Sequence, residues 1–173
     1  MGLSASKRVM TSLVKSSEFD TACDSAFTHC LSLTQHAFDG VLPYQLFTAS
    51  DHIHHSLLSL PDHRRHSLIL KWVPDPPSRA QVDSAFKKVT HDRPKDESSD
   101  VIGSTRFKEW AVVLYVDAVV GNAGKAVLSQ VPIGIAGIAG IGALTRSRRE
   151  LIGTAAGAYA VGVATWIYLS LSG

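Results

Sequence analysis

The sequence predicts an all-α protein, in which a small cytosolic helical bundle precedes a glycine-rich C-terminal membrane hairpin or single transmembrane helix. Apolar residues recur at helical spacing as far as residue 90, and no strand-turn-strand pattern competes with them. Charged residues then almost disappear, since residues 126–173 hold only Arg146, Arg148, Arg149 and Glu150. A segment so poor in charge favours lipid over water.

Length and charge exclude several classes of protein. The chain has 173 residues, 17 Lys and Arg against 15 Asp and Glu, and 45% hydrophobic residues. It is too short for a barrel enzyme, too apolar for a disordered polymer and too evenly charged for a broad nucleic-acid-binding face. We expect four segments: an acylation signal at 1–8, the bundle at 9–90, a linker at 91–104, and an apolar helix with the membrane anchor at 105–173.

The N-terminus, MGLSASKR, matches the pattern for N-myristoylation, with Gly2 behind the initiator Met and Ser6 at the hydroxyl position. A single acyl chain binds membranes with an association constant of about 10⁴ M⁻¹, so a second anchor is expected. Residues 1–17 also contain Lys7, Arg8 and Lys15 without an acid, which is typical of an organelle transit peptide. An ordinary N-terminus is the third interpretation.

The two cysteines, Cys23 and Cys30, are seven residues apart, about 10.5 Å along a helix, too far to pair with each other. Free thiols fit a reducing compartment, and we interpret them as small buried side chains. They lie in a predicted helix that starts at Ser17 and is stopped by Asp39 and Gly40. Its apolar stripe consists of Phe19, Cys23, Ala26, Phe27, Cys30, Leu33, Thr34 and Ala37.

Three further helices are predicted before the linker. One begins at Pro43, with Leu46, Ile53, Leu57 and Leu60 on one face. The second, within residues 62–73, buries Leu68, Ile69 and Trp72, although its apolar run also fits a strand. The third follows the PDPP sequence at 74–77, where Ser78 caps a helix whose inner stripe is Val82, Ala85, Phe86 and Val89.

The linker, HDRPKDESSDVIGS, has no apolar periodicity. A helix then starts at Ser104 or Thr105. Its apolar part is too short to span a bilayer and contains Asp117, so we expect it to pack against other helices.

Two uncharged stretches can cross a bilayer core of about 30 Å: residues 126–145 and residues 151–173. The second is the better span, because Trp166 and Tyr168 lie near one end, where aromatic side chains prefer the membrane interface. A hairpin of both would carry the arginines across the membrane, against the positive-inside tendency, whereas a single C-terminal span keeps them in the cytosol. Both topologies stay open.

Small residues at a spacing of four predict close helix packing in this tail. Gly153 and Gly157 form one such step, Ala158 and Gly162 a second, and Ala136 and Gly140 a third. The residues singled out are therefore Gly2 for lipidation, Gly140, Gly153, Gly157 and Gly162 for membrane helix packing, and Arg146, Arg148 and Arg149 as membrane-proximal cations.

Catalytic signatures are weak. The sequence GNAGKA at 121–126 resembles a phosphate-binding loop but has Val119 and Ala126 at the two decisive positions. Five histidines lie within residues 52–66. Helical spacing relates His52 to His55 and His63 to His66, but Arg64 and Arg65 lie inside the second pair and their charge opposes a divalent cation. We therefore predict no catalytic residues, cofactor or metal, and no enzyme.

The sequence thus favours a helical adaptor or scaffold on the cytosolic face of the plasma membrane or an organelle outer membrane. Myristate and a C-terminal span would tether it, and its partners would be lipid and a protein or a second copy, not nucleic acid. The alternative is an oligomeric channel, translocation or membrane-remodelling subunit built from glycine-rich helices.

Overall fold

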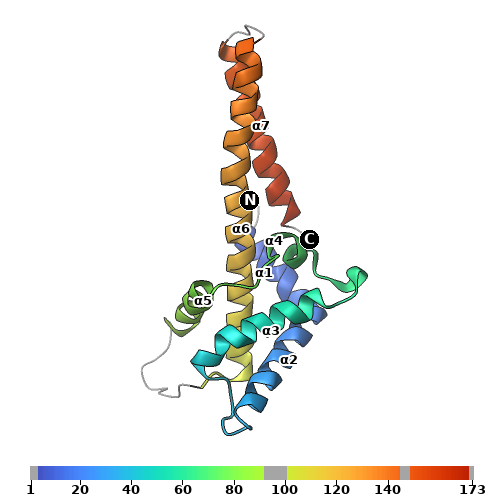
Figure 1. The fold of residues 1–173 in the computed structure, drawn as a ribbon, viewed down its shortest axis with the longest axis vertical. Coiled ribbons are helices and arrows are strands. Elements are labelled where there is room, and N and C mark those ends of the chain that lie inside the picture. The colour runs from blue at the N-terminus through green and yellow to red at the C-terminus, as the bar shows by residue number, and fades with distance from the viewer. Residues whose placement is uncertain (1–3, 92–100, 145–148, 172–173) are drawn as a thin grey trace. The chain divides into compact units, whose positions relative to one another are not determined.

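A computed structural model describes residues 4–91, 101–144 and 149–171. This part of the chain is helical (Figure 1). Its β-structure is one isolated antiparallel bridge between Val41 and Ile102. The all-α prediction is confirmed. The helices are α1 (Ala5–Lys15), α2 (Ser17–Leu33), α3 (Leu46–Leu58), α4 (Ser67–Trp72), α5 (Arg79–His91), α6 (Ser104–Leu144) and α7 (Arg149–Ser170), with 3-10 turns η1 (Pro43–Gln45) and η2 (Asp62–Arg64).

The chain forms two compact units, and the boundary between them lies inside α6, after Val120. The first unit, which we call the bundle, holds α1 to α5 and the start of α6. The second, which we call the hairpin, holds the rest of α6 and α7. The predicted segment 105–173 therefore contributes its first turns to the bundle, as expected from the short apolar stretch around Asp117.

The bundle core is formed chiefly by α2, α3 and α6. The Phe19 ring meets the Tyr115 ring edge-on at 5.5 Å between centroids, and Phe27 meets Phe107 in the same way at 5.4 Å. Such aromatic pairs contribute about 0.5–1.5 kcal/mol beyond the area they bury. The side chains that are almost completely buried here are Cys23, Ala26, Cys30, Leu46, Ala49, Ile53, Phe107, Trp110, Leu114 and Tyr115. The predicted burial of Cys23 and Cys30 is confirmed.

Helix α2 ends earlier than its apolar stripe predicted. Gln35 and His36 have φ angles of 52° and 57°, in the left-handed region that stops an α-helix. The His36 N–H donates to the Leu31 carbonyl at 2.9 Å, which satisfies one of the last carbonyls of the helix. The extension of the stripe to Ala37 was therefore wrong, and Leu33 is exposed.

The loop after α2 is hydrogen-bonded to the segment just before α6, and Gly40 permits this close approach. Val41 and Ile102 exchange backbone hydrogen bonds of 2.9 and 2.8 Å. A Cβ at position 40 would lie only 2.5 Å from the Ile102 carbonyl oxygen, so the close approach requires glycine.

Residues 62–73, for which a strand was the alternative, form η2 and α4, and Leu68, Ile69 and Trp72 of α4 are buried. The predicted cap of α5 is present, since the Ser78 hydroxyl accepts from the Gln81 N–H at 3.4 Å while Gln81 Oε1 accepts from the Ser78 N–H at 2.8 Å.

Helix α1 is an amphipathic helix that sequence reasoning did not single out. The Ser4 hydroxyl accepts a hydrogen bond from the Lys7 N–H at 3.4 Å and caps it. Val9 and Leu13 are completely buried in the bundle, so α1 belongs to the folded unit.

Candidate functional site

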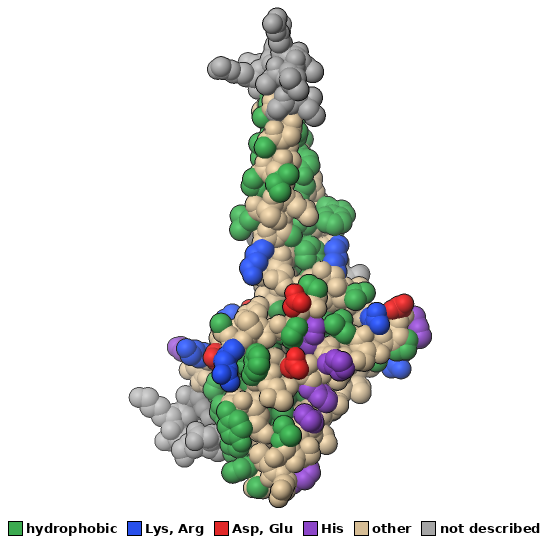
Figure 2. Space-filling view, viewed as in Figure 1, with side chains coloured by type: hydrophobic (Ala, Val, Ile, Leu, Met, Phe, Trp, Pro, Cys, Tyr) green, Lys and Arg blue, Asp and Glu red, His purple; other side chains and the backbone are tan. Residues whose placement is uncertain are grey.

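The hairpin presents apolar side chains on its outside. Leu128 is 76% exposed, Ile133 73% and Val161 67%. Figure 2 shows hydrophobic side chains along the surface of this unit. Large continuous apolar patches are rare on monomeric soluble proteins.

Both hairpin helices are long enough to cross a membrane. The part of α6 from Gly121 to Leu144 rises about 36 Å and the 22 residues of α7 about 33 Å, against a bilayer core of about 30 Å. By length and composition α6 and α7 each contain a candidate span. Most of the buried residues of the α6 candidate lie in the bundle, and after Val120 only Ala123 of its described residues is buried.

Polar groups within the hairpin part of α6 are few and partly satisfied. Pro132 lies inside the helix, as is tolerated in membrane helices. The Ser129 hydroxyl donates to the Ala126 carbonyl at 3.1 Å, which lowers the cost of placing it in lipid.

The two hairpin helices meet at Gly134. A Cβ there would overlap the ring of Tyr159 on α7, so the absence of a side chain admits the ring. Sequence reasoning missed Gly134, although it opens the GIAGIAGIG repeat; its counterpart Tyr159 is too far along the chain to be paired with it by spacing.

The predicted packing glycines lie elsewhere in the hairpin. At Gly153, Gly157 and Gly162 an added Cβ would meet no atom within 4 Å, so these positions face open space. The surroundings of Gly140 and of the Arg149 side chain are outside the described residues, as are Arg146, Arg148 and the lipidation position Gly2. Their roles stay predictions.

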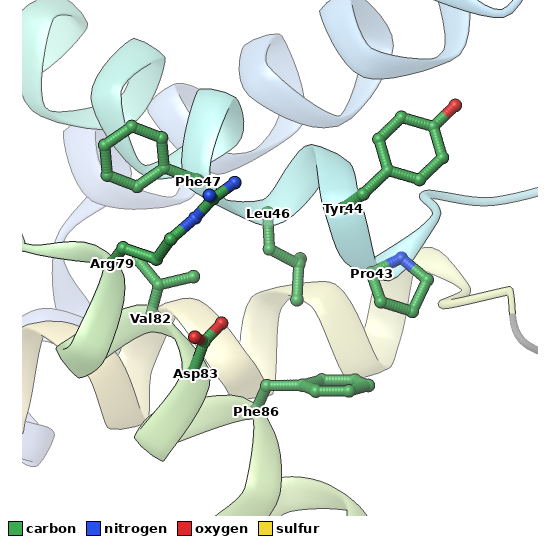
Figure 3. A pocket seen from close by; sticks show the side chains of 8 residues that line it. All are labelled: Pro43, Tyr44, Leu46, Phe47, Arg79, Val82, Asp83 and Phe86. Atoms are coloured by element: carbon green, nitrogen blue, oxygen red, sulfur yellow. The ribbon is translucent and has the colours of Figure 1, made fainter.

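The bundle carries a pocket of about 390 Å³ between the start of α3 and α5 (Figure 3). Tyr44 and Phe47 line it although they are 69% and 41% exposed. The Arg79 guanidinium carbon lies 5.5 Å from the centre of the Phe47 ring, within range of a cation–π interaction. The lining residues are Pro43, Tyr44, Leu46, Phe47, Arg79, Val82, Asp83 and Phe86.

A buried glutamine holds one wall of this pocket in place. Gln45 is 4% exposed, and its Nε2 donates to the Cys30 carbonyl at 2.9 Å. Its Oε1 accepts from the Leu42 N–H at 3.0 Å. These two hydrogen bonds join η1 to the end of α2 and so fix the backbone from which Pro43 and Tyr44 project. No local motif links residues 43–47 to α5, so sequence alone could not reveal the pocket.

The clustered histidines are dispersed by the fold. The Nε2 of buried His54 donates to the Val73 carbonyl at 2.9 Å, while the Nε2 of His66 lies 3.3 Å from the Ser12 hydroxyl. His52 stacks on His29 at 4.6 Å between ring centres, and its Nε2 lies 3.1 Å from the Ser25 hydroxyl. Among the residues described, no three metal-binding side chains converge.

Burial and two neighbouring imidazoles make the protonation of His52 unfavourable. Its pKa is lowered by burial first, and then by His29 and His55. Burial likewise lowers the pKa of His66. Both rings therefore favour the neutral form near neutral pH.

The sequence GNAGKA lies inside the continuous helix α6, so its backbone N–H groups are used within the helix and form no phosphate-binding loop. In comparisons with known proteins, no family model, curated protein or solved structure matches this chain.

Proposed function

We propose that this protein is a membrane-anchored helical adaptor, in which the hairpin lies in the bilayer and the bundle offers a docking surface in the cytosol. One observation carries the proposal: Leu128, Ile133 and Val161 are exposed on the hairpin, whereas the bundle has a buried core that includes Leu13, Ile53 and Leu114. Covering the hairpin with lipid removes the cost of leaving that surface in water.

The Gly134 and Tyr159 contact favours a two-span hairpin over a single C-terminal span. Two spans place the bundle and the C-terminus on one side of the membrane and the Arg146 region on the other. This arrangement runs against the positive-inside tendency, which counts cations in short loops. An organelle outer membrane or the plasma membrane remains the proposed location.

The pocket between α3 and α5 is the proposed docking point for a protein partner. Its floor is apolar, since Leu46 and Val82 are almost completely buried, and exposed aromatic rings stand at its edge. Small concave apolar sites with a few charged groups at the edge, here Arg79 and Asp83, are typical binding sites.

N-myristoylation at Gly2 remains the proposed second tether. Helix α1 supports retention of the N-terminal residues, because removal of a transit segment 1–17 would take Val9 and Leu13 out of the bundle core. Each such side chain contributes about 1.5–3 kcal/mol when buried.

Extraction with alkaline carbonate tests the membrane anchor. The full chain should stay with membranes, while a chain ending at Val120 should be released, because one acyl chain binds only weakly. A full-length chain carrying Gly2→Ala separates the two tethers and should resist extraction as the wild type does. Complete release of the full-length wild type would overturn the anchor.

The second candidate is an oligomeric membrane component. It is favoured by the open positions at Gly153, Gly157 and Gly162, where another helix could approach closely. Crosslinking in membranes tests it: oligomers lost on Gly157→Leu but retained on Gly137→Leu, an equally open position on α6, would assign the contact to the α7 glycines, whereas a monomer in every case favours the adaptor.

A further inference from the structure

Helix α1 has two faces with different chemistry. Val9 and Leu13 point into the bundle and are completely buried. Met10 and Val14 lie beside this buried pair on the helix surface and are 43% and 64% exposed. The inner pair fixes the orientation of the helix, so the outer residues form a defined surface of the folded protein.

The outer face is both apolar and basic. At about 100° per residue, Met10, Val14, Lys7, Thr11 and Lys15 share a sector of about 140°. All five side chains are exposed. The first acidic residue in the chain is Glu18, beyond the end of the helix.

The hydroxyl group between the two lysines of this face is already satisfied. The Thr11 hydroxyl donates to the Lys7 carbonyl at 2.9 Å, so its methyl group can face outward without an unpaired donor. Lys7 and Lys15 both lie on the same side of the Met10 and Val14 strip. Exposed apolar residues beside lysines are typical of helices that lie in the membrane interface, with the apolar side chains among the acyl chains and the ammonium groups at the phosphates.

We propose that the outer face of α1 binds the surface of an anionic bilayer, with Met10 and Val14 entering the headgroup region and Lys7 and Lys15 contacting lipid phosphates. The inference rests on the proposed membrane anchor, which brings the bundle close to lipid. It extends that function, because α1 would bind anionic lipid in preference to neutral lipid without the acyl group. The positive charges of Lys7 and Lys15 complement anionic lipid, which favours a bilayer over an apolar groove of a protein as the binding partner of this face.

A spin label at position 14 tests this in the full-length, unacylated chain. The native thiols do not compete for the label, because Cys23 and Cys30 are only 1% and 0% exposed and burial also raises the pKa of each thiol. The Val14→Cys protein is reconstituted in vesicles of phosphatidylcholine alone or with phosphatidylserine at about 7:3. Ser84→Cys, on an exposed position of α5, is the control.

Collision with a water-soluble nickel complex is measured at both positions. We expect several-fold lower collision at position 14 in the anionic vesicles than in the neutral ones, and no difference at position 84. Adding Lys7→Glu and Lys15→Glu should abolish that protection, because each cation contributes roughly fivefold to binding at an anionic surface.

A label at position 14 that stays equally open to nickel in both vesicles would overturn the inference. So would protection that survives the double charge reversal while circular dichroism shows an intact fold. In both of these outcomes the protein would still float with the vesicles, which shows that the hairpin anchor is intact. Loss of flotation would instead count against the anchor itself, and the inference would fall with it.

Discussion

The bundle and the hairpin use the same helix in opposite ways. Before Val120, α6 turns Trp110, Leu114 and Tyr115 into a core; after it, Leu128 and Ile133 face outward. Apolar content alone therefore does not distinguish a core helix from a membrane helix. The distinction depends on what the rest of the chain provides: α2 and α3 cover the first part of α6, and we propose that lipid covers the second.

Charge separates the two units as clearly as burial does. In the bundle, Lys108 Nζ lies 2.6 Å from Asp20 Oδ1 and 2.8 Å from Asp24 Oδ1, which joins α6 to α2. Lys88 and Asp117 join α5 to α6 at 2.6 Å. The hairpin sequence has no ionised side chain between Lys125 and Arg146 or between Glu150 and the C-terminus. Ion pairs can therefore help to orient the bundle helices, whereas the hairpin helices depend on how well their side chains fit together.

The largest expected effect is a difference in the free energy of unfolding between substitutions at two leucines of α6, one in each unit. Leu114→Ala should lower the free energy of unfolding by about 2–5 kcal/mol, because Leu114 is completely buried. Leu128→Ala should change it by less than about 0.5 kcal/mol. Urea unfolding of the full chain in detergent micelles, followed by circular dichroism, measures both. Equal losses would mean that Leu128 belongs to a core.

The second prediction concerns the contact inside the hairpin. Gly134→Ala should destabilise the hairpin by about 1–3 kcal/mol, because the new methyl group displaces the Tyr159 ring. Gly137→Ala, in open space on the same helix, should be neutral or stabilising by up to about 1 kcal/mol through helix propensity. Thermal unfolding in micelles compares them. Failure of Tyr159→Ala to relieve the Gly134→Ala defect would show that the ring is not the obstacle.

The third prediction tests the charges of the bundle. Lys108→Met should destabilise it by about 1 kcal/mol at low salt, since Asp20 and Asp24 then face each other without a shared cation. The loss should shrink at high salt, where exposed charges are screened. Lys87→Met, at another exposed lysine, is the control. A loss that does not vary with salt would point to lost packing of the lysine stem instead.

The smallest expected effect is a dependence of bundle stability on pH. The folded state lowers the pKa of His52 below that of the unfolded chain, so the unfolded chain takes up protons first as the pH falls. Stability should therefore decrease as the pH falls through about 6.5 and level off below the folded pKa. His66 contributes in the same direction.

Urea midpoints at several values between pH 5.5 and 8 measure this dependence. His52→Gln should flatten the curve, and adding His66→Gln should flatten it further. An unchanged slope in the double variant would assign the dependence to other groups.

Helix positions and their inner faces were largely predictable, because the pattern that buries one face is local. The stripe of Phe19, Cys23 and Ala26 and the Ser78 cap both follow from neighbours within a few residues. The early end of α2 was not predictable, since left-handed backbone at Gln35 and His36 carries no glycine signal. The pocket, the His29 and His52 stack and the Gly134 contact each join residues far apart in the sequence, so no spacing rule could reveal them.

The amino-acid sequence by itself determined that the chain is helical, where its charged residues become rare, and that residues 126–173 include stretches apolar enough to cross a membrane. These properties depend on composition and on a period of 3.6 residues. The sequence also predicted that the apolar helix around Asp117 packs against other helices, but only the tertiary structure decided which residues cover it and where along α6 that cover ends. The sequence of α6 is apolar on both sides of Val120, and the neighbours that bury Leu114 but not Leu128 come from distant parts of the chain. Burial is a property of the assembled helices, and the boundary between core and candidate membrane helix follows from it.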